Sequence, residues 1–299
     1  MGSEAHVVVT GDARLLRVAR ARIDELERRW SRFLPTSEIS FLNSHRGAPH
    51  SVSPDTFRLV GRAIRGWSTT GGRFDPTILG DLIREGYDRP FQALVLDPGS
   101  GVSVLRRNAG GIRTDPEAQT IELPSDAGFD PGGLGKGLGA DIVVEELLAA
   151  GADGACVNLG GDLRVEGVGP DRGRWLISVD HPTEPRPAAM VALAAGGVAT
   201  STSLKRAWTI RGRRRHHLID PETGHSLQSP AVAVTALARD AASAEIATKH
   251  ALLADAGSEL AALEELGCDG LIVTDEGRLE ATAGIASFAV EETSGGDAA

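Results

Sequence analysis

The strongest local signal in the chain is a glycine-rich segment near its middle, residues 130–141, which reads DPGGLGKGLGAD. Glycines let a backbone approach a ligand closely, and the helix expected to follow, closed by Gly151, offers unpaired N–H groups at its start. An anion, most simply a phosphate, fits such a place, and Lys136 adds a formal positive charge. The alternative interpretation is a glycine turn that packs tightly against a sheet.

Two familiar phosphate-binding motifs do not match this segment. A Walker loop requires glycine at position 130 and serine or threonine at position 137, where the chain has Asp130 and Gly137. A dinucleotide fingerprint could be aligned through Gly135, Gly137 and Ala140, but no clear strand precedes it and no well-placed acid follows. The segment therefore indicates an anion site of another kind.

On both sides of this segment, short strands joined by tight turns outnumber the helices. Strands are expected at 6–9, 93–96, 102–105, 120–123, 155–159, 163–166, 175–179, 189–193 and 232–236, with hairpins of 208–210 with 217–219 and of 271–274 with 279–281. Apolar spacing predicts helices after Asp12, from Ser53, over 239–254 and up to residue 266, whereas 31–43 is a polar connection. This pattern predicts a single mixed α+β domain over residues 1–290, with antiparallel-rich sheets, flanking helices and a disordered tail at 291–299.

The composition is that of an acidic globular protein. The 299 residues carry a formal net charge of −10, 41% of them are hydrophobic and 24% are charged. No apolar run approaches the ~20 residues of a membrane span and no leader-like stretch opens the chain, so we expect no membrane insertion and a cytoplasmic location. Nucleic acid is not expected as a partner, because neutralising phosphates requires clustered positive charge.

A second candidate segment reads HHLIDPETG, at residues 216–224. A histidine beside an acid at the end of a strand suits a proton acceptor or a phosphate contact, although Asp220 could simply cap the turn. The preceding arginine run at 211–215 is interpreted as a solvated hairpin tip, with contact to an acidic partner as the alternative. Farther along, Glu245 and Lys249 lie four residues apart on one face of an expected helix, a spacing typical of a stabilising pair.

Taken in order, these segments resemble the motifs of the ApbE family of FAD:protein FMN transferases over residues 1–288. The matching pieces are MGS at 1–3, SRF at 31–33, SEIS at 37–40 with Asn43, FDPT at 74–77, the segment at 130–141, NLGGD at 158–162, ATS at 199–201 and HLIDPETG at 217–224. The resemblance implies an ApbE-like fold that binds FAD with Mg²⁺ on its pyrophosphate. It also implies transfer of the FMN phosphoryl group to a threonine hydroxyl of an acceptor protein, with release of AMP.

The resemblance also implies roles for individual positions. His217 stands where the family has its essential histidine, which would accept the threonine proton or stabilise the transferring phosphoryl group. The flavin and nucleotide pocket would be lined by Met1, Phe33, Arg73, Phe74, Asp75, Asp130, Lys136 and Ile219.

The metal position departs from the family pattern, which places an Asp and, four residues on, a Thr on one helix. In one register Glu245 keeps the acid and Lys249 takes the hydroxyl position; in the other Thr248 keeps the hydroxyl and Ala244 takes the acid position. The third metal position falls at Gly133, which offers only a backbone oxygen. The register that keeps Glu245 is preferred because it retains an oxygen anion, and Lys249 would then either lie at the Mg²⁺ site or contact phosphate directly in place of part of the metal's charge. The hypotheses are an FAD:protein FMN transferase and, as alternatives, a non-catalytic FAD-binding protein or an FAD pyrophosphatase.

Overall fold

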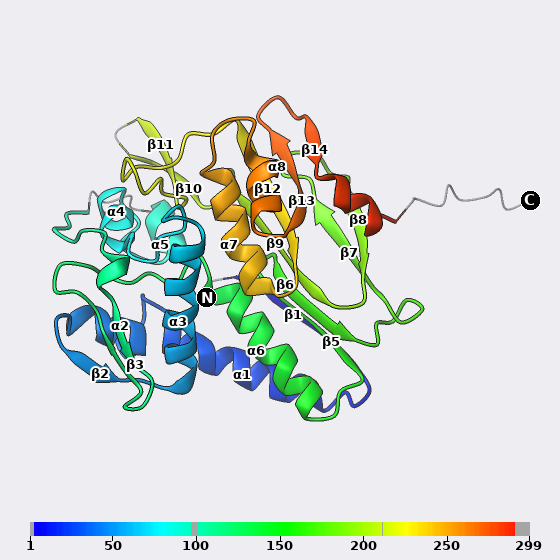
Figure 1. The fold of residues 1–299 in the computed structure, drawn as a ribbon, viewed down its shortest axis with the longest axis horizontal. Coiled ribbons are helices and arrows are strands. Elements are labelled where there is room, and N and C mark those ends of the chain that lie inside the picture. Colours follow the sequence, from blue (N-terminus) through cyan, green and yellow to red (C-terminus); the bar gives the residue numbers. More distant parts are fainter. Residues whose placement is uncertain (1–2, 97–100, 211, 291–299) are drawn as a thin grey trace, which may run out of the picture.

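The structure, a computed structural model that describes residues 3–96, 101–210 and 212–290, is built on a seven-stranded antiparallel sheet (Figure 1). The strand order across the sheet is β1-β5-β6-β9-β12-β13-β14. In that order the strands span Ala5–Thr10, Gly154–Leu159, Asp162–Gly167, Gly196–Thr202, Ala231–Ala238, Asp269–Thr274 and Leu279–Ala281. Sheets of this kind with flanking helices confirm the expected α+β architecture.

Helices pack on one face of the large sheet, and smaller sheets complete the fold. The helices are α1 (Leu15–Trp30), α2 (Glu38–Ser44), α3 (Pro54–Thr69), α4 (Leu79–Arg84), α5 (Phe91–Leu96), α6 (Gly135–Ala149), α7 (Ala241–Leu252) and α8 (Glu259–Glu265), with 3-10 turns η1 (Ala109–Gly111) and η2 (Ala283–Ser287). The smaller sheets pair β7 (Trp175–Asp180) with β8 (Pro187–Leu193), pair β10 (Ala207–Ile210) with β11 (Arg213–His216), and place β4 (Thr120–Glu122) between β2 (Pro49–Ser51) and β3 (Arg113–Asp115). Among the helices of the described residues, none has the length and apolar character needed to cross a membrane.

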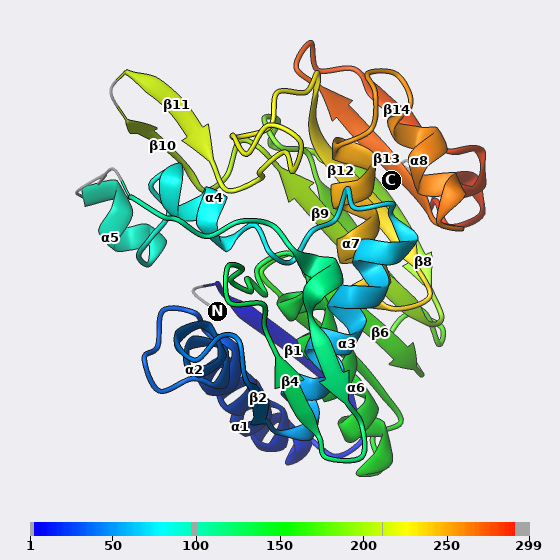
Figure 2. The same cartoon turned by 60° about the vertical axis from the view of Figure 1, so that its left-hand side comes forward.

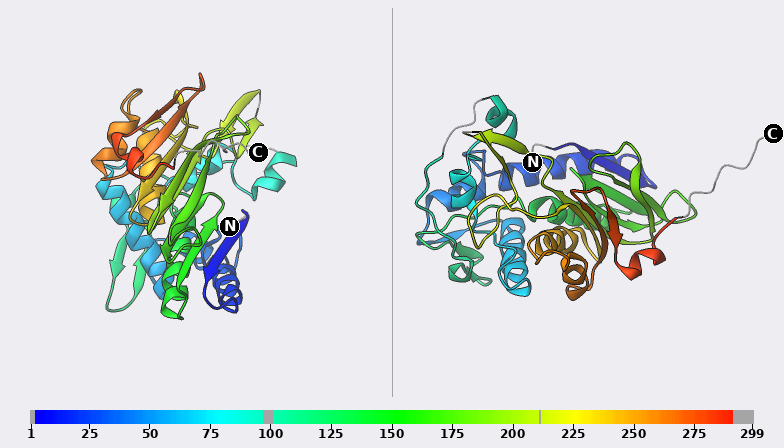
Figure 3. Two further views of the ribbon diagram at one scale, coloured as in Figure 1. Left: turned by 90° about the vertical axis from the view of Figure 1, so that its right-hand side faces the viewer. Right: turned by 90° about the horizontal axis from the view of Figure 1, so that it is seen from above.

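Side chains that alternate along the central strands explain why both faces of the sheet are covered. In β12, Val234 and Ala236 pack with alanines of α7, whereas the neighbouring Leu237 packs with Trp175 and Ile177 of β7 on the opposite face. The β7–β8 ribbon therefore closes one side of the sheet and α6, α7 and α8 close the other (Figures 1 and 3). The N-terminal helices α1 and α3 pack against α6 and α7.

Helix α6 begins inside the glycine-rich segment and crosses the start of α7 at close range. A Cβ atom on Gly137 would lie 2.5 Å from the carbonyl oxygen of Ala241, so this contact requires glycine. Asp141, at the end of the segment, accepts hydrogen bonds from the N–H groups of Ala241 (2.8 Å) and Ala242 (3.0 Å) and thereby satisfies the first amides of α7. Burial raises the pKa of Asp141 to about 6. The glycine-rich segment therefore packs tightly against its neighbours, as one of its two interpretations predicts.

Two short apolar runs that were expected as strands have other structures. Residues 93–96 belong to helix α5, and residues 102–105 form no strand in the described part of the chain. Val102 and Val104 are 90% and 89% exposed. Val102 and Val104 therefore do not form the buried face of a strand. The run at 93–96 has only four apolar residues, which is too short to distinguish a helix from a strand.

Three further expectations are corrected or extended. The connection at 31–43 contains helix α2, whose N-cap Ser37 accepts a hydrogen bond from the Ser40 N–H at 3.0 Å. The second strand of the arginine hairpin is Arg213–His216 instead of 217–219, so the arginines lie in a strand as well as at the tip. Strand β9, in the centre of the large sheet, was not expected. Met1, Arg211 and the tail at 291–299 lie outside the described residues.

Replacing Gly137 by alanine should destabilise the fold. The added methyl group would meet backbone atoms of α7, and overpacking of this kind costs about 1–3 kcal/mol of unfolding free energy. Gly61 in α3 provides the matched control: its nearest neighbour beyond its own helix turn is the flexible end of Arg65, at 3.8 Å. Urea denaturation should therefore show a loss for Gly137→Ala and no loss, or a gain of up to ~1 kcal/mol from helix propensity, for Gly61→Ala. Equal stability of the two variants would contradict the close crossing.

Candidate functional site

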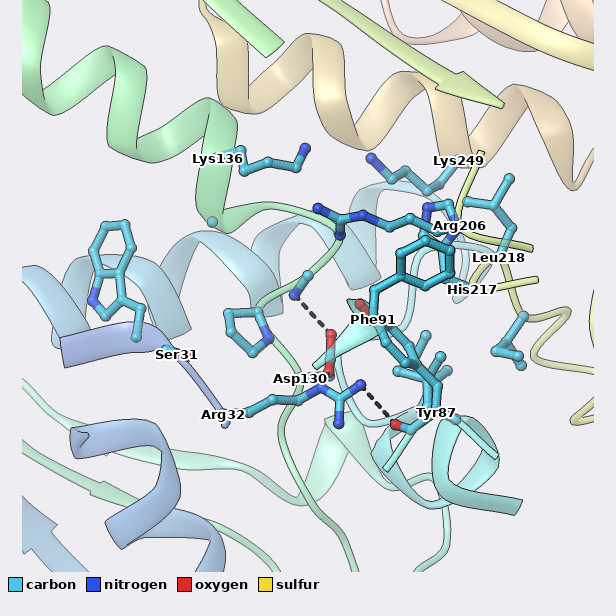
Figure 4. Close-up of a pocket in the computed structure, with 18 of the residues that line it drawn as sticks. Ser31, Arg32, Tyr87, Phe91, Asp130, Lys136, Arg206, His217, Leu218 and Lys249 are labelled. Carbon is cyan, nitrogen blue, oxygen red and sulfur yellow. Dashed lines mark hydrogen bonds and ion pairs between the residues drawn. The ribbon is translucent and has the colours of Figure 1, made fainter. Parts of the chain in front are cut away.

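A cavity of about 600 Å³ is lined by residues from the end of α1, from α4 and α5, from the start of α6 and from the end of α7 (Figure 4). Figure 2 shows how these elements are arranged. Its walls come from segments far apart in the chain, and they include most of the positions that the motifs selected. Those positions are Phe33, Arg73, Phe74, Asp75, Asp130, Gly133, Lys136, His217, Ile219 and Lys249. The volume is typical of a small-molecule or cofactor pocket.

One end of the cavity is built around a single buried carboxylate. Glu245 is fully buried, and one of its oxygens lies 3.1 Å from Lys136 Nζ and 3.4 Å from Lys249 Nζ. Its other oxygen accepts a hydrogen bond from the Gly137 N–H at 2.7 Å. Burial opposes ionisation, but the two ammonium groups hold the pKa of Glu245 below its usual range, so the carboxylate is charged.

The turn at 158–162 supplies a second carboxylate to the same cluster. Gly160 and Gly161 adopt φ values of 67° and 100°, a left-handed conformation that glycine tolerates, and they bring Asp162 into an ion pair with Lys136. A Cβ on Gly160 would lie 3.7 Å from Lys136 Cδ, so the turn also packs along the lysine stem. The NLGGD motif thus positions Lys136.

Arg206 adds a third positive charge to this end of the cavity. Its guanidinium extends toward the same space as the Lys136 and Lys249 side chains (Figure 4), and its Nη2 donates to Ser3 Oγ at 2.8 Å. Three cations therefore face two buried carboxylates, which leaves an excess positive charge at the wall. Burial lowers the pKa of Lys136 to about 8, but the group is still mostly protonated at neutral pH. Such a surface attracts an anionic ligand.

His217 lies beside these cations, directly after strand β11. Its Nδ1 atom is buried and has no hydrogen-bond partner among the described residues. Burial, followed by the charges of Arg206 and Lys249, lowers the pKa of His217 well below its usual value. The imidazole is therefore neutral near pH 7, and a neutral imidazole in a cavity can accept a proton.

Another part of the cavity lining is aromatic and is organised by a buried ion pair. Arg32 Nε lies 2.6 Å from Asp130 Oδ2, and the Arg32 Nη2 donates to the Tyr87 carbonyl oxygen at 2.9 Å. The guanidinium also stacks 4.1 Å from the Phe33 ring centroid and 4.7 Å from that of Tyr87. Asp130 Oδ1 accepts from the Gly132 N–H at 2.7 Å, so the same acid fixes the start of the glycine-rich segment.

The FDPT segment also contributes to the cavity lining. Asp75 Oδ1 accepts hydrogen bonds from the N–H and hydroxyl of Thr77 at 2.7 and 2.5 Å, and burial raises the pKa of Asp75. The Phe74 ring lies against Gly133, where a Cβ would be 3.0 Å from Phe74 Cε2. Phe74 therefore packs directly on the backbone of the glycine-rich segment.

The motifs did not single out four residues that the structure places at this site. In the sequence, Asp162 is only the last residue of the NLGGD turn. Arg32 is only the middle residue of SRF, although a charged residue beside an aromatic one is a detectable signal. Tyr87, the one tyrosine of the chain, and Arg206 carry no local pattern. Arg206 has a positive φ of 49°, which only the structure reveals.

The residues at the implied metal position do not fit a divalent cation. Magnesium takes oxygen ligands, yet both Glu245 oxygens already contact N–H donors or ammonium groups, and the hydroxyl position is occupied by the Lys249 ammonium. In the alternative register, Thr248 is fully buried and its hydroxyl is engaged by Ser201 Oγ (2.7 Å) and the Glu245 carbonyl (2.8 Å), away from the cavity lining. No group of three or more His, Cys, Asp or Glu suited to a metal occurs within the part of the chain that the structure describes.

Fold and pocket together define a protein whose cavity combines cationic side chains with aromatic ones, a lining suited to a ligand with an anionic part and an aromatic part. The ApbE family model matches residues 1–272, so the chain belongs to the ApbE family. A protein of Treponema pallidum named FAD:protein FMN transferase is 30% identical over 274 residues, covering 83% of this chain and 74% of its own length. One of the same name from Vibrio cholerae is 26% identical over 263 residues, covering 85% and 78%.

Solved structures share the same fold. The ApbE protein of Thermotoga maritima superposes with a TM-score of 0.84 at 22% identity, with 97% of each chain covered. The flavin transferase ApbE from Vibrio cholerae gives a TM-score of 0.76 at 22% identity, with 96% of each chain covered.

Removing the charge of Glu245 should destabilise the protein. Glu245→Gln leaves Lys249 without its carboxylate and Lys136 with only Asp162, and breaking a buried ion pair costs about 3–5 kcal/mol. The control is Glu264→Gln on the exposed face of α8, which should change the unfolding free energy by less than ~0.5 kcal/mol.

The stability difference should also depend on pH. Because the pKa of Glu245 is lowered on folding, the difference in unfolding free energy between the wild type and Glu245→Gln should shrink as the pH falls below the usual value of 4.5. Urea titrations at neutral and acidic pH measure both effects, and a pH-independent difference would contradict the charged pair.

Proposed function

We propose that this chain is an FAD:protein FMN transferase, which moves the FMN phosphoryl group of FAD to a threonine hydroxyl of an acceptor protein and releases AMP. The observation that carries the proposal is the placement of the unpartnered His217 Nδ1 beside the cationic wall of Lys136, Lys249 and Arg206. Membership of the ApbE family and the names of the curated relatives support it. The threonine acceptor and a cytoplasmic location stay predictions.

In this proposal the diphosphate of FAD lies against the cationic wall and the flavin lies toward the aromatic residues of the lining. Lys136, Lys249 and Arg206 would stabilise the negative charge that gathers on the diphosphate oxygens during transfer. Phe33, Tyr87 and the other apolar residues of the lining would contact the ring system. Met1, assigned to the pocket by resemblance, stays a prediction.

The chemical step follows from these positions. The threonine Oγ attacks the phosphorus on the FMN side of the diphosphate, and the bond from that phosphorus to the bridging oxygen breaks. The bridging oxygen leaves with AMP. The hydroxyl proton passes to His217 Nδ1 and then to the AMP phosphate or to solvent, so atoms and charge balance.

The direct test is incubation of the full chain with FAD and a library of synthetic peptides that each carry one threonine. We expect covalent flavin fluorescence on the peptides after denaturation, together with an equal amount of AMP. Peptides with valine in place of threonine are the control and should stay unlabelled. Release of FMN and AMP without labelling would instead indicate an FAD pyrophosphatase, and bound but intact FAD would indicate a non-catalytic FAD-binding protein. Either result would contradict the proposed transfer.

Replacing His217 should remove the proton acceptor without removing the pocket. We expect His217→Asn to lower the rate of transfer by about 100-fold or more while FAD still binds. His6→Asn, which alters an exposed histidine of β1, should leave the rate unchanged. Because the pKa of His217 is lowered, the imidazole stays neutral below pH 6.5, so kcat/KM of the wild type should decline only at more acidic pH and this acid limb should be absent in the variant. An unchanged rate in His217→Asn would exclude His217 as the base.

A further inference from the structure

The helix position at which the family pattern requires a hydroxyl carries a lysine that contacts a buried acid. Burial lowers the pKa of Lys249, and Glu245 opposes that shift. Lys249 extends from the third turn of α7, and its side chain is 15% exposed, so the ammonium is largely enclosed by protein. Glu245, one turn earlier on the same helix, contacts it at 3.4 Å. The ammonium is therefore held in place by a fully buried acid instead of projecting freely into solvent.

The same carboxylate oxygen also contacts Lys136 Nζ, at 3.1 Å. One buried anion thus holds two ammonium groups at the wall of the cavity, one from α6 and one from α7 (Figure 4). Each lysine has three N–H donors. Lys249 contacts one carboxylate and Lys136 contacts two, those of Glu245 and Asp162, so each ammonium keeps at least one donor for a bound anion. The arrangement presents charge toward the cavity, whereas a divalent cation needs oxygen ligands that point toward it.

The glycine-rich segment completes the enclosure of Lys249. A Cβ on Gly133 would lie 3.8 Å from Lys249 Cε, so the end of the lysine stem passes close to the segment that would otherwise offer a backbone oxygen to a metal. Lys249 therefore lies between Glu245 and Gly133, which are the other two positions that the family pattern assigns to metal binding.

We propose that the Lys249 ammonium takes the place of a divalent cation, so that the chain binds FAD, and transfers its FMN group, without a metal ion. This inference rests on the proposed function. With Lys136 and Arg206, Lys249 supplies fixed positive charge to the diphosphate through N–H donors. The reaction then needs no group beyond FAD, the acceptor hydroxyl and the residues of the pocket.

The first experiment measures FAD binding to the wild-type chain by the change in flavin fluorescence, in excess EDTA and in Mg²⁺. We expect dissociation constants that agree within about twofold, which is a small difference in binding free energy. Weakening by about tenfold or more in EDTA would overturn the inference while leaving FAD binding, and hence the proposed function, intact. Absence of FAD binding under both conditions would overturn the proposed function and the inference with it.

Lys249→Thr provides the reciprocal test, since it restores the acid and hydroxyl pair of the family pattern. We expect FAD affinity in EDTA to fall by about tenfold, because one fixed charge is lost, and Mg²⁺ to recover it. Lys249→Met, which keeps the length of the side chain without charge or oxygen, should lose affinity and show no recovery with Mg²⁺. Lys205→Thr makes the same substitution at an exposed lysine outside the cavity and should bind FAD as the wild type does.

Two further outcomes, one with a variant and one with the wild type, would overturn the inference. One is wild-type FAD affinity for Lys249→Met in EDTA, since the ammonium would then contribute nothing. The other is stimulation of wild-type transfer by Mg²⁺ over the EDTA level by about tenfold or more, as measured by AMP release. Thermal melting of each variant checks that the fold is retained, and the wild-type comparison in EDTA needs no variant at all.

Discussion

The site depends on one buried carboxylate. Glu245 contacts the first turn of α6 through the Gly137 N–H, Lys136 on the same turn, and Lys249 on its own helix. A buried charge is costly unless each of its oxygens is paired, and here both are. The carboxylate therefore does two things: it links the first turn of α6 to α7, and it holds two ammonium groups at the wall of the cavity. Stability of the core and charge of the pocket are consequences of the same contact.

The glycine-rich segment has a double role for the same reason. Gly137 is needed because the Ala241 carbonyl lies too close for a side chain, and Asp141 satisfies the first amides of α7. Gly133, four residues earlier than Gly137, lies against the Phe74 ring at the cavity wall. One segment therefore packs tightly against α7 and also lines the cavity, through Gly133 and Lys136. Residue types alone could not separate these two roles, because glycine serves both purposes.

Much of the fold could be predicted from periodicity, and the failures have specific physical causes. Helices α1 and α3 carry regular apolar faces, and the β5–β6 hairpin is marked by its glycines, so these elements were found. The run at 93–96 is too short for periodicity to decide, and Val102 and Val104 alternate without being buried. Of the site, the motifs located His217 and Lys136. Arg206 reaches the cavity through an unusual backbone angle, and Asp162 through a turn, and long-range placements of this kind leave no local pattern.

Exchanging a bound cation for a tethered ammonium changes the thermodynamics of a diphosphate site. A divalent ion brings twice the charge of lysine, but its occupancy depends on its concentration and on ligands that must lose their own contacts to hold it. Lys249 is present in every molecule, and the cost of its desolvation is offset in part within the fold by Glu245. The smaller charge is offset in part by Arg206 and Lys136, which face the same space. Because three separate cations can each approach a different phosphate oxygen, the charge is spread along the diphosphate instead of being concentrated at one point. In the proposed complex such a wall suits an extended anion better than a compact one, and the aromatic residues of the same lining are left to contact the ring system of the flavin.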